Sequence, residues 1–344
     1  MIGPVLAALL APAPLDAHDA RRTFDLLLAP ASTDAERASI LVALASRPDS
    51  PAELTAFAGE LRRRASPFPV PRRDGAIDLC GTGGASRPSF NVSTVSAFLV
   101  AAAGTPVVKH GNASARGPCG SSDLLLALGL PIDRAPKFAR ESYRRYGLAF
   151  LHAPLFHPTT RAVGPARRLL GIPTLFNRLG PLSNPAGVPY QVVGVPNAEL
   201  ARTMALALAG LGTRGAISMS SEEGCDEFSP REPTHLFRWT GQGVVRATVR
   251  PELLLPGEDR RGPWGALTPP AAAEETRRLL AGGGGARRGS VLLTSGAALW
   301  VSGRARSLAS GLERARDALD SGRAEELLHQ LEALAPRFAG ARGE

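Results

Sequence analysis

The chain is poor in aromatic residues and in cysteine, and it contains no long apolar run. Aromatic side chains make up 5% of its 344 residues, which leaves little surface on which single-stranded nucleic acid could stack. The three cysteines, Cys80, Cys119 and Cys225, form no CxxC pair and no disulfide framework, as is usual in a reducing cytoplasm. No stretch approaches the roughly 18 residues without charge or proline that a membrane-spanning helix needs. We therefore expect a cytoplasmic globular protein of about two domains.

Lysine is almost absent, although the chain is strongly basic. Lys109 and Lys137 are the only lysines among 40 basic residues, and the formal net charge is +9. The arginines are scattered, and their longest run is Arg62 to Arg64, so no basic block marks a nucleic-acid-binding face. A phosphate-rich small substrate accounts for the positive excess equally well. We therefore expect small-molecule substrates, with nucleic acid as the weaker alternative and no membrane.

Residues 1–72 have the pattern of a small helical domain. Their apolar segment IGPVLAALLAPAPLDA follows no positive residue and is interrupted by prolines, so it predicts a first helix rather than an export signal. TDAE at 33–36 and SPAE at 50–53 are capping boxes, each followed by apolar residues at helical spacing. The proline-rich stretch 66–75 closes this domain as a linker or hinge.

From residue 73 to 344 short apolar segments alternate with helical ones, which predicts an α/β domain. We expect a central, mainly parallel sheet whose strands include AIDLC, TPVVKHG, YQVVGV and GAISMS. Residues 131–190 read as helical and loop-rich, and we expect their helices to join the N-terminal domain. AGGGGARRG at 281–289 predicts a flexible surface loop.

The segment IDLCGTGG places three glycines directly after a predicted strand, and a helix opening with polar residues follows. Without Cβ atoms, Gly81, Gly83 and Gly84 allow successive N–H groups to face one anion. The helix start adds unpaired donors, and Asn91, Ser93 and Thr94 add side-chain donors. The spacing fits neither the dinucleotide fingerprint nor the P-loop, and close packing is the alternative explanation for the glycines.

A second turn of the same kind follows the next predicted strand, in VVKHGNASARGPCGSSD. Lys109 ends that strand with a point charge that suits a phosphate. Gly111, Asn112 and Ser114 follow in the turn, and Ser121 begins the next helix. Since the ends of neighbouring strands meet at one edge of an α/β sheet, both turns should line one ligand-binding cleft. For His110 we favour a packed or hydrogen-bonded turn histidine.

The motifs GTGG, FNVST, KHGN and GSSD, in this order, resemble the anthranilate phosphoribosyltransferase family. The likeness covers nearly the whole chain from residue 20, and it continues through HAPLFHPTTRAVGPARRLLGIPTLFNRLGPLSNPAG, GCDEFSP and SGAALWVSGRARSLASGLERA. TLFNRLGPLSNPA is a highly specific string. The pyrimidine nucleoside phosphorylases share the fold and a KHGN-like turn, but they lack the GTGG spacing and the FNRLGPL segment.

The resemblance implies transfer of a phosphoribosyl group from phosphoribosyl pyrophosphate to the amino group of anthranilate, in tryptophan synthesis. It also implies the nucleoside phosphorylase/phosphoribosyltransferase-like fold, in which a helical domain packs on an α/β domain. Two Mg²⁺ ions and a homodimer formed through the helical domains complete the expectation. Because pyrophosphate leaves as the ribose becomes oxocarbenium-like, we expect catalysis by electrostatics and positioning, with no catalytic nucleophile.

The same resemblance assigns the site residues. Those that would bind phosphoribosyl pyrophosphate are Gly81, Gly83, Gly84, Ser89, Asn91, Val92, Ser93, Thr94, Lys109, His110, Gly111, Asn112, Ser114 and Ser121. Those that would bind anthranilate are Gly81, Asn112 and Arg167, and the spacing to Gly171 selects Arg167 over its neighbour Arg168. The metal ligands would be Ser93, Asp226 and Glu227, whose hard oxygens suit Mg²⁺.

The chain departs from the family at two positions. Ala85 follows GTGG where the family has Asp, and Ala113 follows KHGN where the family has Arg. Arg87 or Arg116 restores some positive charge, but neither restores the acid. Two alternatives therefore stay open: a relative that uses another acceptor, and a catalytically idle nucleic-acid-binding protein on the same fold. The retained donors and acidic pair count against the idle protein, and a thiol or zinc site at the three cysteines is the weaker explanation of their position.

Overall fold

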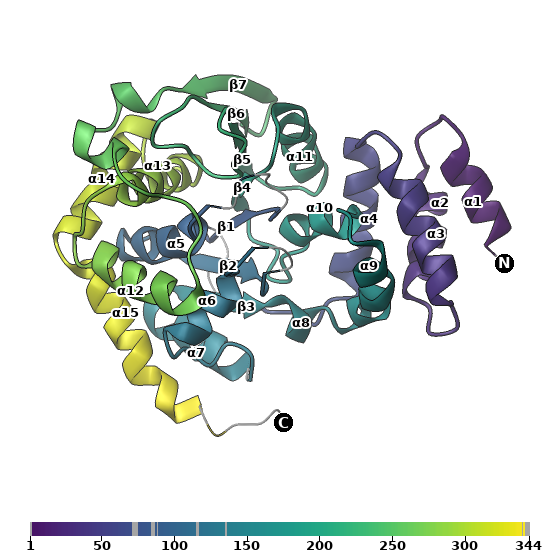
Figure 1. Ribbon diagram of the computed structural model, residues 1–344, viewed down its shortest axis with the longest axis horizontal. Helices are drawn as coiled ribbons and strands as arrows, with labels where there is room; N and C mark the ends of the chain where they lie inside the picture. The colour runs from purple at the N-terminus through teal and green to yellow at the C-terminus, as the bar shows by residue number, and fades with distance from the viewer. Residues whose placement is uncertain are drawn as a thin grey trace.

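The computed structural model describes residues 2–70, 75–83, 87, 89–114, 117–134, 136–338 and 340. Helices at the N-terminal end stand beside a larger body built on one sheet (Figure 1). These helices are α1 (Gly3–Leu10), α2 (Ala17–Leu28), α3 (Asp34–Ala45) and α4 (Pro51–Arg63). Later in the chain α8 (Ala153–Phe156) leads into α9 (Gly164–Leu170) and α10 (Leu175–Leu182). α9 packs against α3, and α10 packs against α3 and α4.

The capping boxes predicted at the starts of α3 and α4 differ in outcome. At α3 the Thr33 hydroxyl accepts the Glu36 N–H and the Glu36 carboxylate accepts the Thr33 N–H at 2.8 Å, so this box is complete. At α4 the Ser50 hydroxyl accepts the Glu53 N–H, but Glu53 Oε1 accepts the Leu15 N–H at 2.7 Å instead. The second box is therefore only half formed: the Ser50 hydroxyl bond is present, but the Glu53 carboxylate bonds to the segment before α2 instead of to the Ser50 N–H.

The described residues form one sheet of seven strands in the order β3-β2-β1-β4-β5-β6-β7. The strands are β1 (Ile77–Gly81), β2 (Val107–Gly111), β3 (Leu148–His152), β4 (Tyr190–Gly194), β5 (Gly215–Ser221), β6 (Thr234–Trp239) and β7 (Val244–Val249). The first five in chain order run parallel, and β6 and β7 add an antiparallel edge. The predicted α/β class with a mainly parallel sheet is confirmed.

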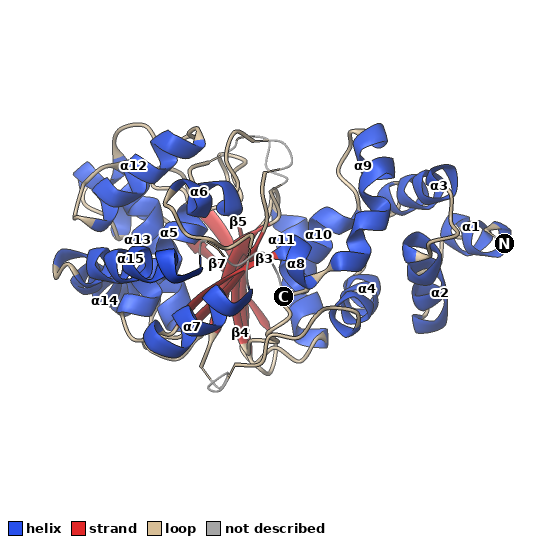
Figure 2. Cartoon of the chain, turned by 90° about the horizontal axis from the view of Figure 1, so that it is seen from below, coloured by secondary structure: helices blue, strands red, loops and turns tan. Residues whose placement is uncertain are grey.

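Helices cover both faces of the sheet, which Figure 2 shows edge-on. The remaining helices are α5 (Val92–Ala102), α6 (Ser121–Ala127), α7 (Pro136–Tyr146), α11 (Ala198–Gly210), α12 (Pro269–Leu280), α13 (Ala286–Val301), α14 (Leu308–Asp320) and α15 (Arg323–Leu334), with 3-10 turns η1 (Pro158–Val163), η2 (Pro251–Leu253), η3 (Gly257–Arg260) and η4 (Ala335–Phe338). Successive strand residues face opposite layers, as the pleat requires. Leu79 packs among α5 and α13, whereas Cys80 packs among α10 and α11.

Two sequence predictions need correction. The segment 131–190 contains α7 and the strand β3, which pairs with β2, so only its later part lies with the N-terminal helices. LAFLH is a short run buried on both faces, and periodicity does not distinguish such a strand from a buried helical segment. The loop predicted over 281–289 ends at Gly285, because α13 begins at Ala286. No helix within the described residues is long and apolar enough to cross a membrane.

Candidate active site

A cavity of about 320 Å³ opens where the carboxyl ends of β1 and β2 face α9 and α10. One side, which we call the sheet wall, comes from the strand ends and the start of α5. The other side, the helix wall, comes from α9 and α10. The sheet wall includes these predicted residues: Gly81, Gly83, Ser89, Asn91, Ser93, Thr94, Lys109, His110, Gly111, Asn112, Ser114, Ser121, Asp226 and Glu227. The helix wall is formed by Arg167, Phe176, Asn177, Gly180 and Pro181.

Of the predicted residues that the structure describes, Val92 is the one that does not line the cavity. Val92 is fully buried in the core between α5 and the sheet, because its apolar side chain faces inward from the first turn of the helix. Gly84 lies outside the described residues, as do Ala85 and Arg116. Sequence reasoning gave no role to Phe176, Asn177 and Gly180, although TLFNRLGPL was recognised as a family string.

The first glycine turn and the start of α5 each direct an N–H group at one carboxylate of the acidic pair Asp226 and Glu227. Gly83 has φ +63°, a conformation that glycine adopts without strain, and its N–H donates to Asp226 Oδ2 at 3.0 Å. Within the described residues α5 has no side-chain N-cap, and Asn91 instead donates to Cys119 O at 3.1 Å. The Ser93 N–H points to Glu227 Oε1 at 3.4 Å. A helix start of this kind favours anionic groups.

Lys109 places a buried positive charge at the base of the sheet wall. Its side chain is 3% exposed, and its ammonium donates to Leu79 O at 2.5 Å and to Ser93 Oγ at 3.2 Å. The charge of Lys109 lowers the pKa of Glu227, although burial outweighs it. The Lys109 ammonium therefore bonds to the first turn of α5 through Ser93 and also stabilises the ionised form of Glu227 in the acidic pair.

Asp226 and Glu227 form a buried acidic pair beside the glycine turn. Burial raises the pKa of Asp226 above its usual range, and burial with the neighbouring Asp226 charge raises that of Glu227 well above it. Among the described residues Glu227 Oε2 is buried without a hydrogen-bond partner. Buried carboxylates with an unmatched oxygen require a proton or a cation, so these residues fit a divalent ion bound by hard oxygens.

The second turn is held against the start of α6. Asp123 Oδ2 accepts the N–H groups of Ser114 at 2.9 Å and Gly120 at 2.8 Å. A Cβ atom at Gly120 would lie 2.3 Å from the Ser114 nitrogen, so the close approach needs glycine. Ser121 packs on Gly111 in the same way, and its hydroxyl donates to Asn112 O at 3.2 Å. One acidic side chain thus fixes both sides of the polar turn.

Arg167 is the positive group of the helix wall. α9 ends at Leu170 and is followed by Gly171 in a left-handed conformation, and Arg167 lies one turn before that glycine and lines the cavity. Its guanidinium lies 5.5 Å from the centre of the Phe176 ring and 3.4 Å from Asn177 Oδ1. Arg168 is exposed and does not line the cavity, so the choice of Arg167 agrees with the geometry.

His110 and His157 meet behind the cavity, with ring centres 5.0 Å apart. Burial and the neighbouring His157 lower the pKa of His110 to about 3, and burial lowers that of His157 to about 4. His110 Nδ1 lies 3.3 Å from Gly180 O. Both rings are therefore neutral near pH 7, and His110 is a packed, hydrogen-bonded residue that also lines the cavity.

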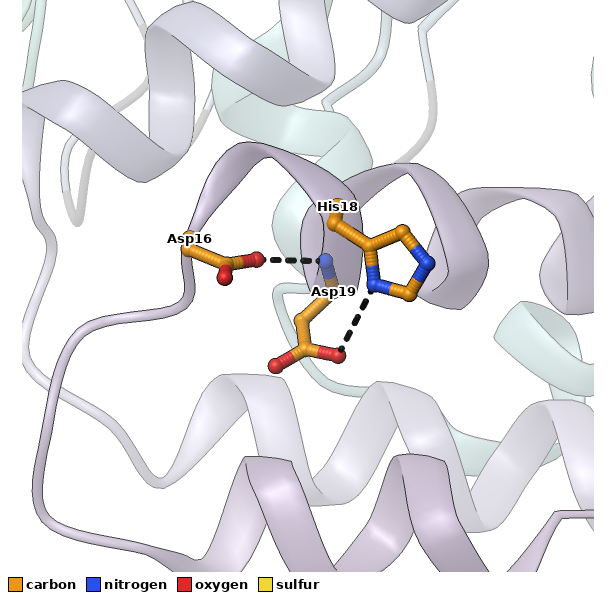
Figure 3. Close-up of side chains that lie close together, drawn as sticks. All are labelled: Asp16, His18 and Asp19. Carbon is orange, nitrogen blue, oxygen red and sulfur yellow. Dashed lines mark hydrogen bonds and ion pairs between the residues drawn. The ribbon is translucent and has the colours of Figure 1, made fainter.

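The cysteines and a surface acidic group offer no competing site. Each cysteine is a free thiol, and burial raises the pKa of all three, which disfavours the thiolate that metal binding or redox chemistry needs. Asp16, His18 and Asp19 cluster at the start of α2 (Figure 3). There Asp16 accepts the Asp19 N–H at 2.7 Å, so the group is an exposed helix N-cap.

The fold and the cavity define a glycosyltransferase: residues 73–325 match the family described as glycosyl transferase family, a/b domain. Anthranilate phosphoribosyltransferases of Thermomicrobium roseum (39% identical) and Rubrobacter xylanophilus (36%) match over 99% of each chain. The crystal structure of anthranilate phosphoribosyltransferase from Thermus thermophilus superposes with a TM-score of 0.88 at 36% identity, over 96% of this chain and 99% of that one. The chain belongs to the anthranilate phosphoribosyltransferase family.

A more distant structure shares the fold. It is anthranilate phosphoribosyltransferase from Saccharomyces cerevisiae in complex with PRPP and Mg, at 24% identity, a TM-score of 0.87 and 98% coverage of both chains. At this identity the likeness concerns the arrangement of the elements. The family and fold that the sequence motifs predict are confirmed.

Proposed function

We propose that this chain transfers the phosphoribosyl group of 5-phosphoribosyl 1-pyrophosphate to the amino group of anthranilate. The products are N-(5-phosphoribosyl)anthranilate and pyrophosphate, in tryptophan biosynthesis. The observation that carries the proposal is that one cavity joins a wall of anion-binding groups to a wall that presents Arg167. The reaction needs both kinds of wall, because its donor carries phosphates and its acceptor carries a carboxylate.

In this proposal the sheet wall binds the donor. The positive end of α5 and the Lys109 ammonium offer fixed positive charge to phosphate oxygens, while the Gly83 N–H holds Asp226 beside them. Negative charge grows on the leaving pyrophosphate as the ribose carbon becomes positive. Donors that are already in place stabilise that change without reorganising, so positioning and electrostatics supply the catalysis. We assign no nucleophile.

The helix wall binds the acceptor. The Arg167 guanidinium suits the anthranilate carboxylate, and the Phe176 ring beside it offers an apolar face. Gly81 and Asn112 line the same cavity on the sheet wall and would lie near the acceptor ring. The neutral His110 adds no charge that would attract the carboxylate away from Arg167.

Ser93, Asp226 and Glu227 would hold Mg²⁺, with two ions per subunit as the resemblance implies. The unmatched Glu227 Oε2 is the observation that favours a cation here. When bound, Mg²⁺ neutralises charge on the pyrophosphate and its leaving oxygens. The yeast structure named with PRPP and Mg supports the use of magnesium, but not these ligands or the number of ions.

We also propose a cytoplasmic homodimer that associates through the helical part, with the domain boundary near residue 72. α3 packs against both α1 and α9. These helices and the end of α9 carry the exposed apolar side chains Leu10, Val42, Leu169 and Ile172, and two of them, Leu10 and Leu169, are 74% and 78% exposed. Apolar side chains gathered on neighbouring helices favour association.

Ala85 and Ala113 keep a second candidate open, in which the same cavity serves another acceptor. Ala113 donates its N–H to Asn112 Oδ1 at 2.8 Å, so this turn keeps its shape without the family arginine. Ala85→Asp separates the candidates. A gain of about tenfold in kcat/KM for both substrates, roughly 1.4 kcal/mol, indicates that the chain transfers the group to anthranilate and lacks only the family carboxylate at this position. Loss of activity in Ala85→Asp at every Mg²⁺ concentration indicates that the donor-binding pocket is arranged differently around Ala85.

Loss of anthranilate fluorescence tests the proposed function. We expect a decay that requires phosphoribosyl pyrophosphate and Mg²⁺ together and that stops on addition of a chelator. The same protein is then titrated with DNA at low and high salt. Salt-dependent DNA binding without any fluorescence decay would instead support the idle nucleic-acid-binding protein.

A further inference from the structure

β1 and β2 separate toward the edge of the sheet where the cavity opens. In the described strands they are paired at Ile77 and Val107 alone, whereas β1 and β4 are paired along their whole length. If the parallel ladder continued, Leu79 would bond to Val108 O and to the His110 N–H. Both of these β2 groups are bonded to side chains instead.

The carboxylate of Asp78 and the amide of Asn184 fill the gap between the two strands. Asp78 Oδ1 accepts the His110 N–H at 3.2 Å, and Asp78 Oδ2 accepts the Asn184 amide at 2.9 Å. The same Asn184 nitrogen donates to Val108 O at 2.8 Å, and Asn184 Oδ1 accepts the Ala186 N–H at 2.9 Å. Asp78 and Asn184 are 0% and 2% exposed, so water does not compete for these bonds.

Lys109 crosses the same gap from the β2 side. Its ammonium bonds to Leu79 O, the β1 carbonyl that a continued ladder would have paired with β2. The Lys109 charge also affects the buried carboxylate of Asp78. Burial raises the pKa of Asp78 to about 6, and the positive charge of Lys109 partly offsets this increase. Side chains thus replace one step of the ladder at the point where the sheet wall begins.

Asn184 belongs to the turn that follows α10, and α10 forms much of the helix wall. Gly180 and Pro181 line the cavity just before this turn. Arg62 on α4 donates to Leu182 O at 2.7 Å and so holds the same turn from the helical part. The Asp78–Asn184 bond is therefore a direct link between the strands of the sheet wall and the end of the helix wall.

We propose that Asp78 and Asn184 are positioning residues that set the separation of the sheet wall and the helix wall. The inference rests on the proposed function, because that separation is then the distance between donor and acceptor. Neither side chain lines the cavity, so neither contacts a substrate. A misplacement of about 1 Å between reacting groups costs about a hundredfold in rate, so a link of this kind affects turnover more than binding.

Asp78→Asn and Asn184→Ala test the proposal. Asn at 78 keeps the shape of Asp but has one acceptor oxygen, so it serves only one of the two donors. We expect kcat to fall at least about tenfold in each variant, while the Kd of each substrate measured alone changes less than about threefold. The double variant should be no slower than the slower single variant, because both remove one link. Ser96→Ala is the control: it removes a buried hydroxyl bonded to Val291 O and should leave kcat unchanged.

An unchanged kcat, a loss confined to the binding of one substrate, or additive losses would each overturn the proposal. Hydrogen exchange at the His110 amide gives a readout that needs no turnover, and it should be at least about tenfold faster in Asp78→Asn than in the wild type. Unchanged exchange would also overturn the proposal. If Asp78→Asn does not fold, the rate and binding measurements on Asn184→Ala decide. A wild-type protein without transfer activity would count against the proposed function, while the exchange experiment still tests the link.

Discussion

The main chain of Asp226 lies directly on Gly194. A Cβ atom at Gly194 would come within 1.7 Å of the Asp226 carbonyl oxygen, and one at Gly81 would lie 3.0 Å from Asp226 Oδ2. Gly81 and Gly194 are partners in the register of β1 and β4. The two glycines, which we call the glycine seat, leave room for the acidic pair. At Gly194 only a residue without a Cβ atom allows the approach of the Asp226 backbone, whereas at Gly81 a Cβ atom would make a tight contact with the Asp226 side chain.

Replacement of the glycine seat should therefore disable the acidic pair. Gly194→Ala forces the segment around Asp226 to move, and we expect Mg²⁺ binding at least about tenfold weaker together with a comparable loss of turnover. Calorimetric titration with Mg²⁺ in the presence of phosphoribosyl pyrophosphate measures the binding. Gly59→Ala on α4 is the control, since nothing lies within 4 Å of a Cβ atom there. Wild-type Mg²⁺ affinity in Gly194→Ala would contradict the role of the seat.

Neutralising the acidic pair should abolish turnover without loss of stability. Asp226→Asn with Glu227→Gln keeps the shape of both side chains but removes their charge. Because burial raises the pKa of both acids, their ionised forms are unfavourable in the folded protein without metal. We expect the midpoint of thermal unfolding without Mg²⁺ to be at least that of the wild type. Full activity in the double variant would remove these residues from the site.

The two neighbouring arginines of α9 should behave differently. Arg167→Ala removes a charge-assisted contact of about 1.5–3 kcal/mol, so the KM for anthranilate should rise about tenfold to a hundredfold. Arg168→Ala is the matched control, because Arg168 is exposed and outside the cavity. Steady-state kinetics with each substrate varied in turn measures both. A change in the KM for phosphoribosyl pyrophosphate alone would show that Arg167 does not bind the acceptor.

The buried His110 should make stability fall in mild acid. Its pKa is about 3 in the folded protein and 6.5 in the unfolded chain, so between these values protons bind the unfolded chain only. The free energy of unfolding should therefore drop by about 2 kcal/mol from this group between pH 7 and pH 5. Urea unfolding of wild type and His110→Asn at both pH values measures the difference. Comparing the two proteins cancels the opposite contribution of the buried carboxylates, and equal pH dependence would contradict the assignment.

The sequence predicted those parts of the site that depend on neighbouring residues. The glycine turn, the uncapped start of α5 and the polar turn after β2 are local patterns, and parallel strands necessarily bring them to one edge. Arg167 was implied by the family resemblance, and its spacing to Gly171, the left-handed residue after α9, selected it over Arg168. The side chain of Val92 packs in the core, so its predicted part in donor binding stays a prediction.

Contacts between distant segments were not predictable in this way. Gly194 lies in an ordinary strand sequence, and its need for glycine comes from Asp226, far along the chain. Asp78 and Asn184 meet across 106 positions, and nothing in either local pattern indicates the partner. β3 was missed because a short strand buried on both faces has no distinctive period.

The most direct test of the proposed reaction is to identify its products. Wild-type protein is incubated with phosphoribosyl pyrophosphate, Mg²⁺ and anthranilate, and separately with other aromatic amines, and pyrophosphate and the conjugate are quantified by phosphorus NMR and mass spectrometry. The account predicts one pyrophosphate released for each anthranilate consumed, with a single product whose mass is that of phosphoribosylated anthranilate. Release of pyrophosphate with a different amine but not with anthranilate would contradict it.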